Sequence, residues 1–117
     1  IKDNHIEAVG SITEALRLAS EGHHLAKIEV EVENLNDLKE AVEGGADIVM
    51  LDNMSIHDMK EAVNIVRTSK KDVILEASGN VTIDNVREVA ETGVDLISIG
   101  ALTHSATAVD ISMKIVR

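Results

Sequence analysis

Residues able to bind a phosphorylated sugar follow four short apolar runs of the sequence. These residues are carboxylates, amides, a hydroxyl and glycines: Glu31 and Glu33, Asp52-Asn53, Ser78-Gly79-Asn80, and Gly100-Ala101. Carboxylates can accept hydrogen bonds from sugar hydroxyls or help to hold a divalent cation. Glycine turns that lead into a helix N-terminus present unpaired N–H groups, which suit a phosphate. Each group alone is a weak signal, so the inference of a phosphorylated sugar depends on their joint occurrence in strand order.

Two further residues, Lys2 and His104, could contact an anion. Lys2 belongs to the opening Lys2-Asp3-Asn4-His5, which could end a strand or could be a solvated tail, and the tail is the simpler interpretation. As a strand-end residue, Lys2 would supply positive charge for an anionic substrate. His104 lies just before a predicted helix cap at Ser105, within reach of an anion at that helix N-terminus. No histidine spacing supports a transition metal held by the protein.

Alternating strands and helices must position these residues. Runs rich in Ile, Val and Leu predict strands at 26–33, 47–52, 73–79 and 95–100. Capping patterns predict five helices, opened by Ser11, Asn34, Ser55, Thr82 and Ser105. Strand–helix alternation of this kind indicates parallel strands joined by right-handed crossovers. An internal repeat, 43–51 against 91–99, recurs after two such units, as in a duplicated barrel or a solenoid.

One face of the predicted sheet is polar. Side chains alternate along a strand, so Glu29, Glu31 and Glu33 share the face opposite Val30 and Val32. Glu76 with Ser78, and Ser98 with Gly100, repeat the pattern on later strands. Strands of a parallel sheet covered on both faces should be apolar throughout. A barrel lumen that opens into an active site would explain the polar face, and so would a half-covered sheet that faces water.

The composition excludes several classes of protein. The 117 residues suffice for one domain and include no Cys, Pro, Phe, Tyr or Trp, which rules out disulfide scaffolds, Cys-ligated zinc and thiol catalysis. A net charge of −10 repels nucleic acid, and no apolar run is long enough to span a membrane. We therefore expect a soluble cytoplasmic protein that binds neither nucleic acid nor membranes. The start at Ile1 rather than Met suggests a piece of a longer protein or a rebuilt sequence.

The sequence also resembles the quinolinate phosphoribosyltransferase family, also called nicotinate-nucleotide pyrophosphorylase (carboxylating). The resemblance covers nearly the whole chain and lies in five segments: IKDNHI at 1–6, KIEVEVEN at 27–34, GADIVMLDNMS at 45–55, LEASGNVT at 75–82 and GVDLISIGALTHS at 93–105. It implies a pentosyl transfer in NAD biosynthesis, in which quinolinate and phosphoribosyl pyrophosphate give nicotinate mononucleotide, pyrophosphate and CO2. The implied fold is the C-terminal part of an open, TIM-like α/β barrel, with residues 1–117 as a single partial domain.

The resemblance also implies roles for individual residues. Lys2 would contact the anionic substrates, while Glu31 and Asp52 would bind the ribose hydroxyls and help to position a magnesium-bound diphosphate. The implied 5′-phosphate site consists of Ser78, Gly79, Asn80, Ile99, Gly100, Ala101 and His104. Magnesium would arrive with the substrate, with Asp52 as its one candidate protein contact, and the family's subunits pair into homo-oligomers.

Three interpretations remain open. The family's arginines that grip quinolinate precede this region, and the four arginines here, at 17, 67, 87 and 117, lie on predicted helices. The first interpretation is therefore a ribose- and phosphate-binding half site that is inactive, or nearly so, alone. The second is an isolated or engineered half-barrel without catalysis, which self-associates or flattens into a flavodoxin-like sheet because four strands cannot close a barrel. The third, a receiver-type signalling domain, is disfavoured because the last strand ends in Gly100 rather than lysine.

Overall fold

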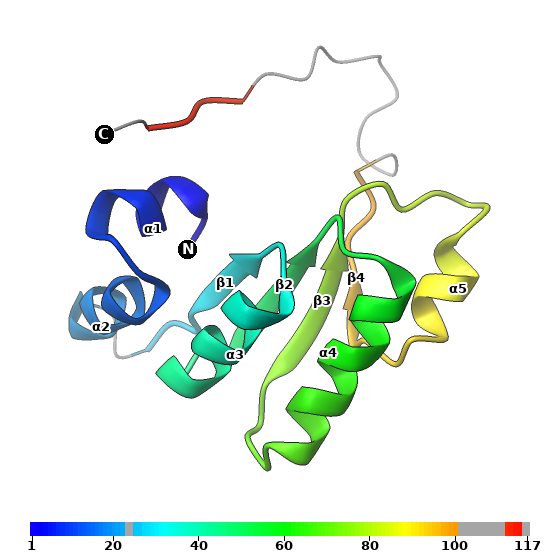
Figure 1. Ribbon diagram of the computed structural model, residues 1–117, viewed down its shortest axis with the longest axis horizontal. Coiled ribbons are helices and arrows are strands. Elements are labelled where there is room, and N and C mark those ends of the chain that lie inside the picture. The colour runs from blue at the N-terminus through cyan, green and yellow to red at the C-terminus, as the bar shows by residue number, and fades with distance from the viewer. Residues whose placement is uncertain (23–24, 101–111, 116–117) are drawn as a thin grey trace.

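The computed structural model describes residues 1–22, 25–100 and 112–115 (Figure 1). Its elements in chain order are α1 (Asp3–Val9), α2 (Ile12–Gly22), β1 (Glu29–Val32), α3 (Leu35–Gly44), β2 (Ile48–Asp52), α4 (Ile56–Thr68), β3 (Ile74–Ser78), α5 (Val86–Ala90) and β4 (Leu96–Ile97). All four predicted strands are present, each within its predicted range and shorter than it. The helix predicted from Ser105 lies outside the described residues.

Within the described ranges, four strands form one parallel sheet in the order β1-β2-β3-β4. Each strand pairs with the next along the chain, and a helix lies in each of the three crossovers, as predicted. Right-handed crossovers that all step in one direction place their helices on the same face of the sheet. This is the arrangement of a barrel wall. It lacks the reversal of strand order that a flavodoxin-like sheet would require.

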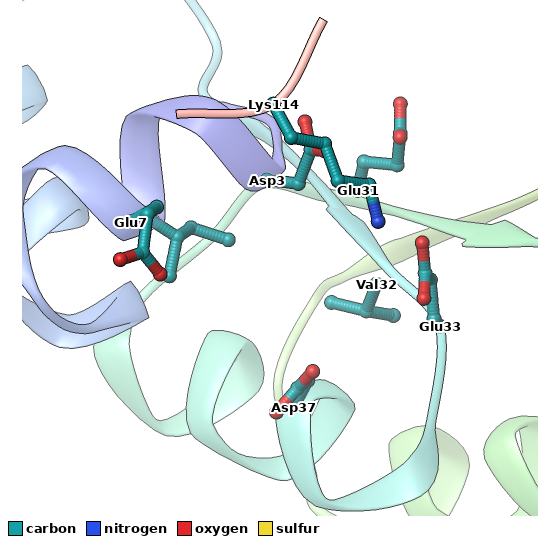
Figure 2. Close-up of a pocket in the computed structure, with 8 residues that line it drawn as sticks. Asp3, Glu7, Glu31, Val32, Glu33, Asp37 and Lys114 are labelled. Atoms are coloured by element: carbon teal, nitrogen blue, oxygen red, sulfur yellow. The ribbon is translucent and has the colours of Figure 1, made fainter. Parts of the chain in front are cut away.

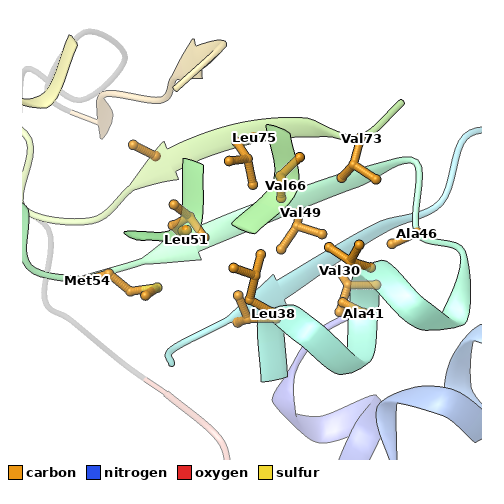
Figure 3. Close-up of a cluster of buried hydrophobic side chains, with 14 of the residues drawn as sticks. Val30, Leu38, Ala41, Ala46, Val49, Leu51, Met54, Val66, Val73 and Leu75 are labelled. Atoms are coloured by element: carbon orange, nitrogen blue, oxygen red, sulfur yellow. The ribbon is translucent and has the colours of Figure 1, made fainter. Parts of the chain in front are cut away.

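The core lies between this sheet and its helices (Figure 3). Val30, Val49 and Leu75 are in register on β1, β2 and β3, and all three are fully buried. Leu38 of α3 and Val66 of α4 are buried in the same cluster. Burial of a valine or leucine side chain contributes about 1.5–3 kcal/mol, so this apolar face is what holds the helices against the sheet. Alternate residues of β1, β2 and β3 are only half-buried, which confirms that the two faces differ.

The helix starts predicted at Ser11, Asn34 and Ser55 are confirmed by side-chain caps. Asn34 Oδ1 accepts hydrogen bonds from the backbone N–H groups of Asn36 and Asp37, both at 3.0 Å. The hydroxyl of Ser11 accepts from the Glu14 N–H, and that of Ser55 accepts from the Asp58 N–H, both at 3.1 Å. These bonds satisfy N–H groups that the first turn of a helix leaves unpaired.

The sequence repeat has a structural cause in two aspartates. Asp47 precedes β2, and its Oδ2 accepts a hydrogen bond of 2.8 Å from the Ile28 N–H before β1. Asp95 precedes β4, and its Oδ2 accepts a bond of the same length from the Leu75 N–H of β3. In both copies, the aspartate therefore ties the start of one strand to the backbone of the preceding strand. The sequence repeat therefore corresponds to the same aspartate-to-backbone hydrogen bond at two places in the sheet.

The fourth helix begins later than predicted. Its first residue is Val86 rather than one following a Thr82 cap, and residues 83–85 form a turn. The side chain of Asn85 explains the shift: its Oδ1 accepts from the Thr82 N–H at 2.8 Å, and its Nδ2 donates to the Asn80 carbonyl at 3.0 Å. These bonds hold the segment after β3 as a loop, so α5 has only five residues.

The opening residues form a helix that was not predicted. α1 begins at Asp3, and the preceding Ile1 pairs with β1 through two backbone bonds, from Ile1 N to Glu29 O at 2.6 Å and from Glu31 N to Ile1 O at 2.9 Å. Bonds to residues on either side of Val30 are the parallel-strand pattern. Lys2 therefore follows a strand-like position, so the solvated-tail interpretation is wrong and the strand-end interpretation is right.

The described C-terminal segment, residues 112–115, lies beside α1 (Figure 1). The side chain of Asn4 holds it in place, because Nδ2 donates to the Met113 carbonyl at 2.7 Å and Oδ1 accepts from the Ile115 N–H at 3.0 Å. Across the residues that the structure describes, no helix is long and apolar enough to cross a membrane.

Candidate functional site

The carboxyl ends of the parallel strands bring the predicted site residues to one edge of the sheet. Asp52, the last residue of β2, is in register with Ser78, the last residue of β3. Glu31 on β1 is in register with Met50, which is in register with Glu76 on β3. Residues in register on parallel strands point to the same face, so Glu31, Asp52, Glu76 and Ser78 all belong to the sheet face opposite the helices.

This open face gathers negative charge. Glu29, Glu31 and Glu76 lie on it, and the Ser98 hydroxyl donates a short hydrogen bond to Glu76 Oε1. Burial raises the pKa of the Glu29 carboxyl, and the charges of Glu76 and Glu31 add to that effect, while Lys2 and the chain's amino terminus oppose it. Glu29 Oε1 is buried without a hydrogen-bond partner among the described residues. A cation is the ligand that such a face favours.

Lys2 supplies positive charge at this face. Its Nζ lies 3.3 Å from Glu31 Oε2, and its side chain is 67% exposed, against 20% for Glu31. The strand-like pairing of Ile1 with β1 brings the two residues together. Because its ammonium group is still largely solvated, Lys2 can turn toward an anion without leaving a buried position.

An acidic hollow of about 220 Å³ adjoins Glu31 (Figure 2). Glu31, Glu33 and Asp37 line it together with α1, and the Lys114 side chain extends among these carboxylates. Glu33 is exposed at the end of β1, as the strand pattern predicted. The hollow is rich in oxygen acceptors, so it suits hydroxyl groups or cations better than phosphate.

The loop after β3 provides the other half of the candidate site. Gly79 has φ +84°, a conformation that side chains with a Cβ rarely adopt. Ser78 and Gly79 are half-buried and Asn80 is exposed, so the loop is accessible. The predicted helix N-terminus does not directly follow it, since α5 begins only at Val86. A phosphate here would therefore be bound by loop N–H groups and side chains and not by a helix dipole.

The loop after β4 is described only in part. Ser98 N donates to the Ala77 carbonyl at 2.9 Å, which carries the pairing with β3 past the end of β4. Ile99 is half-buried and Gly100 is exposed, next to the strand end as predicted. Ala101 and His104, the other predicted phosphate-site residues, lie outside the described residues. The phosphate-binding roles of all these residues remain predictions.

Two asparagines contribute to this edge: Asn53, which the sequence placed beside Asp52 among the candidate residues, and Asn85, which it did not single out. The Asn53 side chain contacts both Asp52 and Asn80, and Asn85 holds the loop after β3. Asn53 and Asn80 both have positive φ, 53° and 50°. Asparagine tolerates this conformation better than most residues, so an asparagine directly after a predicted strand was a usable signal.

The sheet, its helices on one face and its polar carboxyl edge define an α/β protein of the barrel type, with a candidate ligand site at the strand ends. Residues 1–114 match the family described as quinolinate phosphoribosyl transferase, C-terminal domain, and the chain belongs to that family. The resemblance noted in the sequence is thereby confirmed.

Known relatives are similar along the whole chain. A probable nicotinate-nucleotide pyrophosphorylase (carboxylating) from Methanocaldococcus jannaschii is 49% identical over all of this chain and 43% of its own length. The human nicotinate-nucleotide pyrophosphorylase (carboxylating) is 36% identical over 98% of this chain and 39% of its own length. The solved nicotinate-nucleotide pyrophosphorylase of Francisella tularensis superposes with a TM-score of 0.84 at 45% identity, over 96% of this chain and 39% of that one. The chain thus spans less than half the length of these relatives.

Proposed function

We propose that this chain carries the ribose- and phosphate-binding half of a site for phosphoribosyl transfer to quinolinate. The products would be nicotinate mononucleotide, pyrophosphate and CO2. One observation carries the proposal: Glu31, Asp52 and Ser78-Gly79-Asn80 lie along one edge of the sheet, in a chain that belongs to this family. The carboxylates of Glu31 and Asp52 would accept hydrogen bonds from the ribose hydroxyls of a phosphoribosyl group. The loop Ser78-Gly79-Asn80 would bind its 5′-phosphate.

The arrangement suits a displacement at the anomeric carbon. As diphosphate leaves, positive charge develops on the ribose, and carboxylates fixed beside it stabilise that charge. Glu31 and Asp52 are placed to do this, while Lys2 is exposed enough to contact the departing anion. Because Lys2 is paired with Glu31 here, ligand binding would exchange part of that ion pair for contacts to the ligand's hydroxyls and phosphates.

Magnesium bound to the substrate is part of this proposal. The described residues contain no cluster of three or more His, Cys, Asp or Glu side chains arranged to hold a metal ion. Where Mg²⁺ is carried by substrate phosphates, it takes only one or two protein carboxylates. Asp52 is the residue that we assign to it, and when bound the metal would neutralise charge on the leaving diphosphate.

Quinolinate recognition is assigned to residues outside this chain. Arg67 is already engaged with Asp95, and Arg17 with Glu14 and Glu21, all away from the carboxyl edge. We therefore expect the chain to bind phosphoribosyl pyrophosphate without catalysing the transfer alone. We also propose a cytoplasmic homo-oligomer as its context, and the exposed Leu96 on the open sheet face favours a contact there.

Calorimetry with phosphoribosyl pyrophosphate and Mg²⁺ tests the proposal. The unaltered chain should bind, and Asp52→Ala should weaken binding about tenfold, as expected for a lost charge-assisted contact. Asp72→Ala is the matched control, because Asp72 is an exposed aspartate just before β3, at the opposite edge of the sheet. Absence of binding, or equal binding by Asp52→Ala, would rule out the proposed site. Added quinolinate should produce no heat.

A further inference from the structure

Asn53 bridges the two halves of the candidate site. Its Nδ2 donates a 3.1 Å hydrogen bond to Asp52 Oδ2, and its Oδ1 accepts a 2.8 Å bond from Asn80 Nδ2. Its backbone N–H donates to the Ser78 carbonyl at 2.9 Å. One side chain therefore contacts the last residue of β2 and the loop after β3 at the same time.

The surrounding backbone is shaped to accept this side chain. Asn53 takes up the left-handed conformation, with φ 53°, which turns the chain immediately after β2. A Cβ on Gly79 would overlap the Asn53 side-chain amide. Glycine at 79 is thus favoured both by its own φ and by the close approach of the Asn53 side chain.

The hydrogen bonds run in one direction. Asn85 Nδ2 donates to the Asn80 carbonyl, Asn80 Nδ2 donates to Asn53 Oδ1, and Asn53 Nδ2 donates to Asp52. The series ends on Asp52 Oδ2, which accepts the last of these hydrogen bonds. The ligand-facing carboxylate and the loop after β3 are therefore connected through two amides.

We propose that Asn53 is a positioning residue that fixes the Asp52 carboxylate relative to the loop Ser78-Gly79-Asn80. It does not itself contact the ligand. Its role is to set the separation between the group that binds the ribose and the loop that binds the phosphate. This inference rests on the proposed function, because it assigns those two groups to one phosphoribosyl ligand.

Two substitutions distinguish the contact of Asn53 with Asp52 from its contact with Asn80. Asn53→Asp keeps an oxygen that can accept from Asn80 but replaces the donor to Asp52 with a second, repelling carboxylate. Asn53→Gly removes both contacts, and glycine tolerates φ 53° without strain. Asn64→Asp adds the same charge on the exposed surface of α4, and Lys70→Gly places glycine at another left-handed position, φ 60°, so these variants are the controls.

The test compares two probes by calorimetry: phosphoribosyl pyrophosphate with Mg²⁺, which spans both groups, and inorganic phosphate, which reaches only the loop. Asn53→Asp should weaken binding of phosphoribosyl pyrophosphate about threefold to tenfold and that of inorganic phosphate less than twofold. Asn53→Gly should weaken both, the larger ligand more. The side-chain amide resonances of Asn80 should shift in the Gly variant without any ligand. Both control variants should bind as the unaltered chain does.

Each outcome decides a specific claim. If the unaltered chain binds neither probe, the proposed function fails and this inference fails with it. If the unaltered chain binds but both Asn53 variants weaken the two probes by equal factors, Asn53 only maintains the loop and the positioning role is overturned. Unchanged binding of phosphoribosyl pyrophosphate by either variant would overturn the role as well.

Discussion

Lys2 Nζ lies 3.3 Å from Glu31 Oε2, across the joint where the first residues of the chain pair with β1. This ion pair joins the positive charge of Lys2 to a sheet face that otherwise carries the carboxylates of Glu29 and Glu76. Its position at the carboxyl end of β1 makes it part of the candidate site. Because Lys2 is largely exposed, the ion pair contributes little to folding.

Replacement of Lys2 by methionine should therefore separate binding from stability. Exposed ion pairs contribute about 0–1 kcal/mol, so the free energy of unfolding in urea should change by less than about 1 kcal/mol. Binding of phosphoribosyl pyrophosphate should weaken at least about fivefold, because the ligand loses a cation at a strongly acidic face. Lys39→Met on the exposed surface of α3 is the control. Unchanged calorimetric affinity in Lys2→Met would remove Lys2 from the site.

Asp95 should make the stability of the chain depend on pH. Burial acts to raise the pKa of this carboxyl, but the hydrogen bonds from Arg67 and from the Leu75 N–H outweigh it and lower the pKa below its usual value. A lowered pKa stabilises the folded state above the unfolded pKa, about 3.9, and this contribution is lost as pH falls through the folded value.

Asp95→Asn should accordingly cost about 1–2 kcal/mol at pH 7 and less at pH 3, which lies below the unfolded pKa, because part of the carboxylate's contribution is lost there. Urea unfolding of both proteins at the two pH values measures this difference. Asp84→Asn, at an exposed loop position, serves as the control. A difference between Asp95→Asn and the unaltered chain that is the same at both pH values would contradict this assignment.

The strands and most helix starts were predictable because they depend on local patterns. Val30 alternates with glutamates, Val49 and Leu75 lie in short apolar runs, and Asn34 and Ser55 cap the helices that follow them, so these elements could be predicted from their own segments. The one-sided cover of the sheet also followed from the polar alternate positions. The position of the strand-end residues at one edge followed from the parallel order.

The errors come from specific hydrogen bonds that the strand and capping patterns do not encode. Helix α1 was missed because the residue before it, Ile1, is held by a backbone hydrogen bond to Glu29 of β1, twenty-eight residues away in sequence. The late start of α5 results from the Asn85 side chain, which binds the loop before it. The role of Asn53 depends on its contact with Asn80 in the loop after β3, which no spacing within either motif reveals. Hydrogen bonds made by individual backbone and side-chain groups were thus the part that sequence patterns could not supply.

Truncation of Leu38 should be among the most destabilising single changes in the core. The side chain is fully buried between α3 and the sheet, where its loss leaves a cavity that the packed strands cannot fill. Leu38→Ala should lower the free energy of unfolding by about 2–5 kcal/mol. Leu25→Ala should change it by less than about 0.5 kcal/mol, since Leu25 is fully exposed. Similar urea midpoints for the two variants would contradict this placement of the core.

Gly79→Ala should lower the free energy of unfolding by more than the strain of its backbone conformation alone would. Gly10 has a similar conformation, φ +100° against +84°, but an added Cβ there meets no atom within 4 Å. Gly10→Ala therefore measures the cost of the conformation itself, about 1 kcal/mol. Gly79→Ala adds the overlap with Asn53, so it should cost more in urea unfolding and should also weaken phosphoribosyl pyrophosphate binding.

In an Asn53→Gly background the overlap is absent, and the stability cost of Gly79→Ala should fall to that of Gly10→Ala. Equal costs of Gly79→Ala in the two backgrounds would show that Asn53 and the loop do not approach as closely as described.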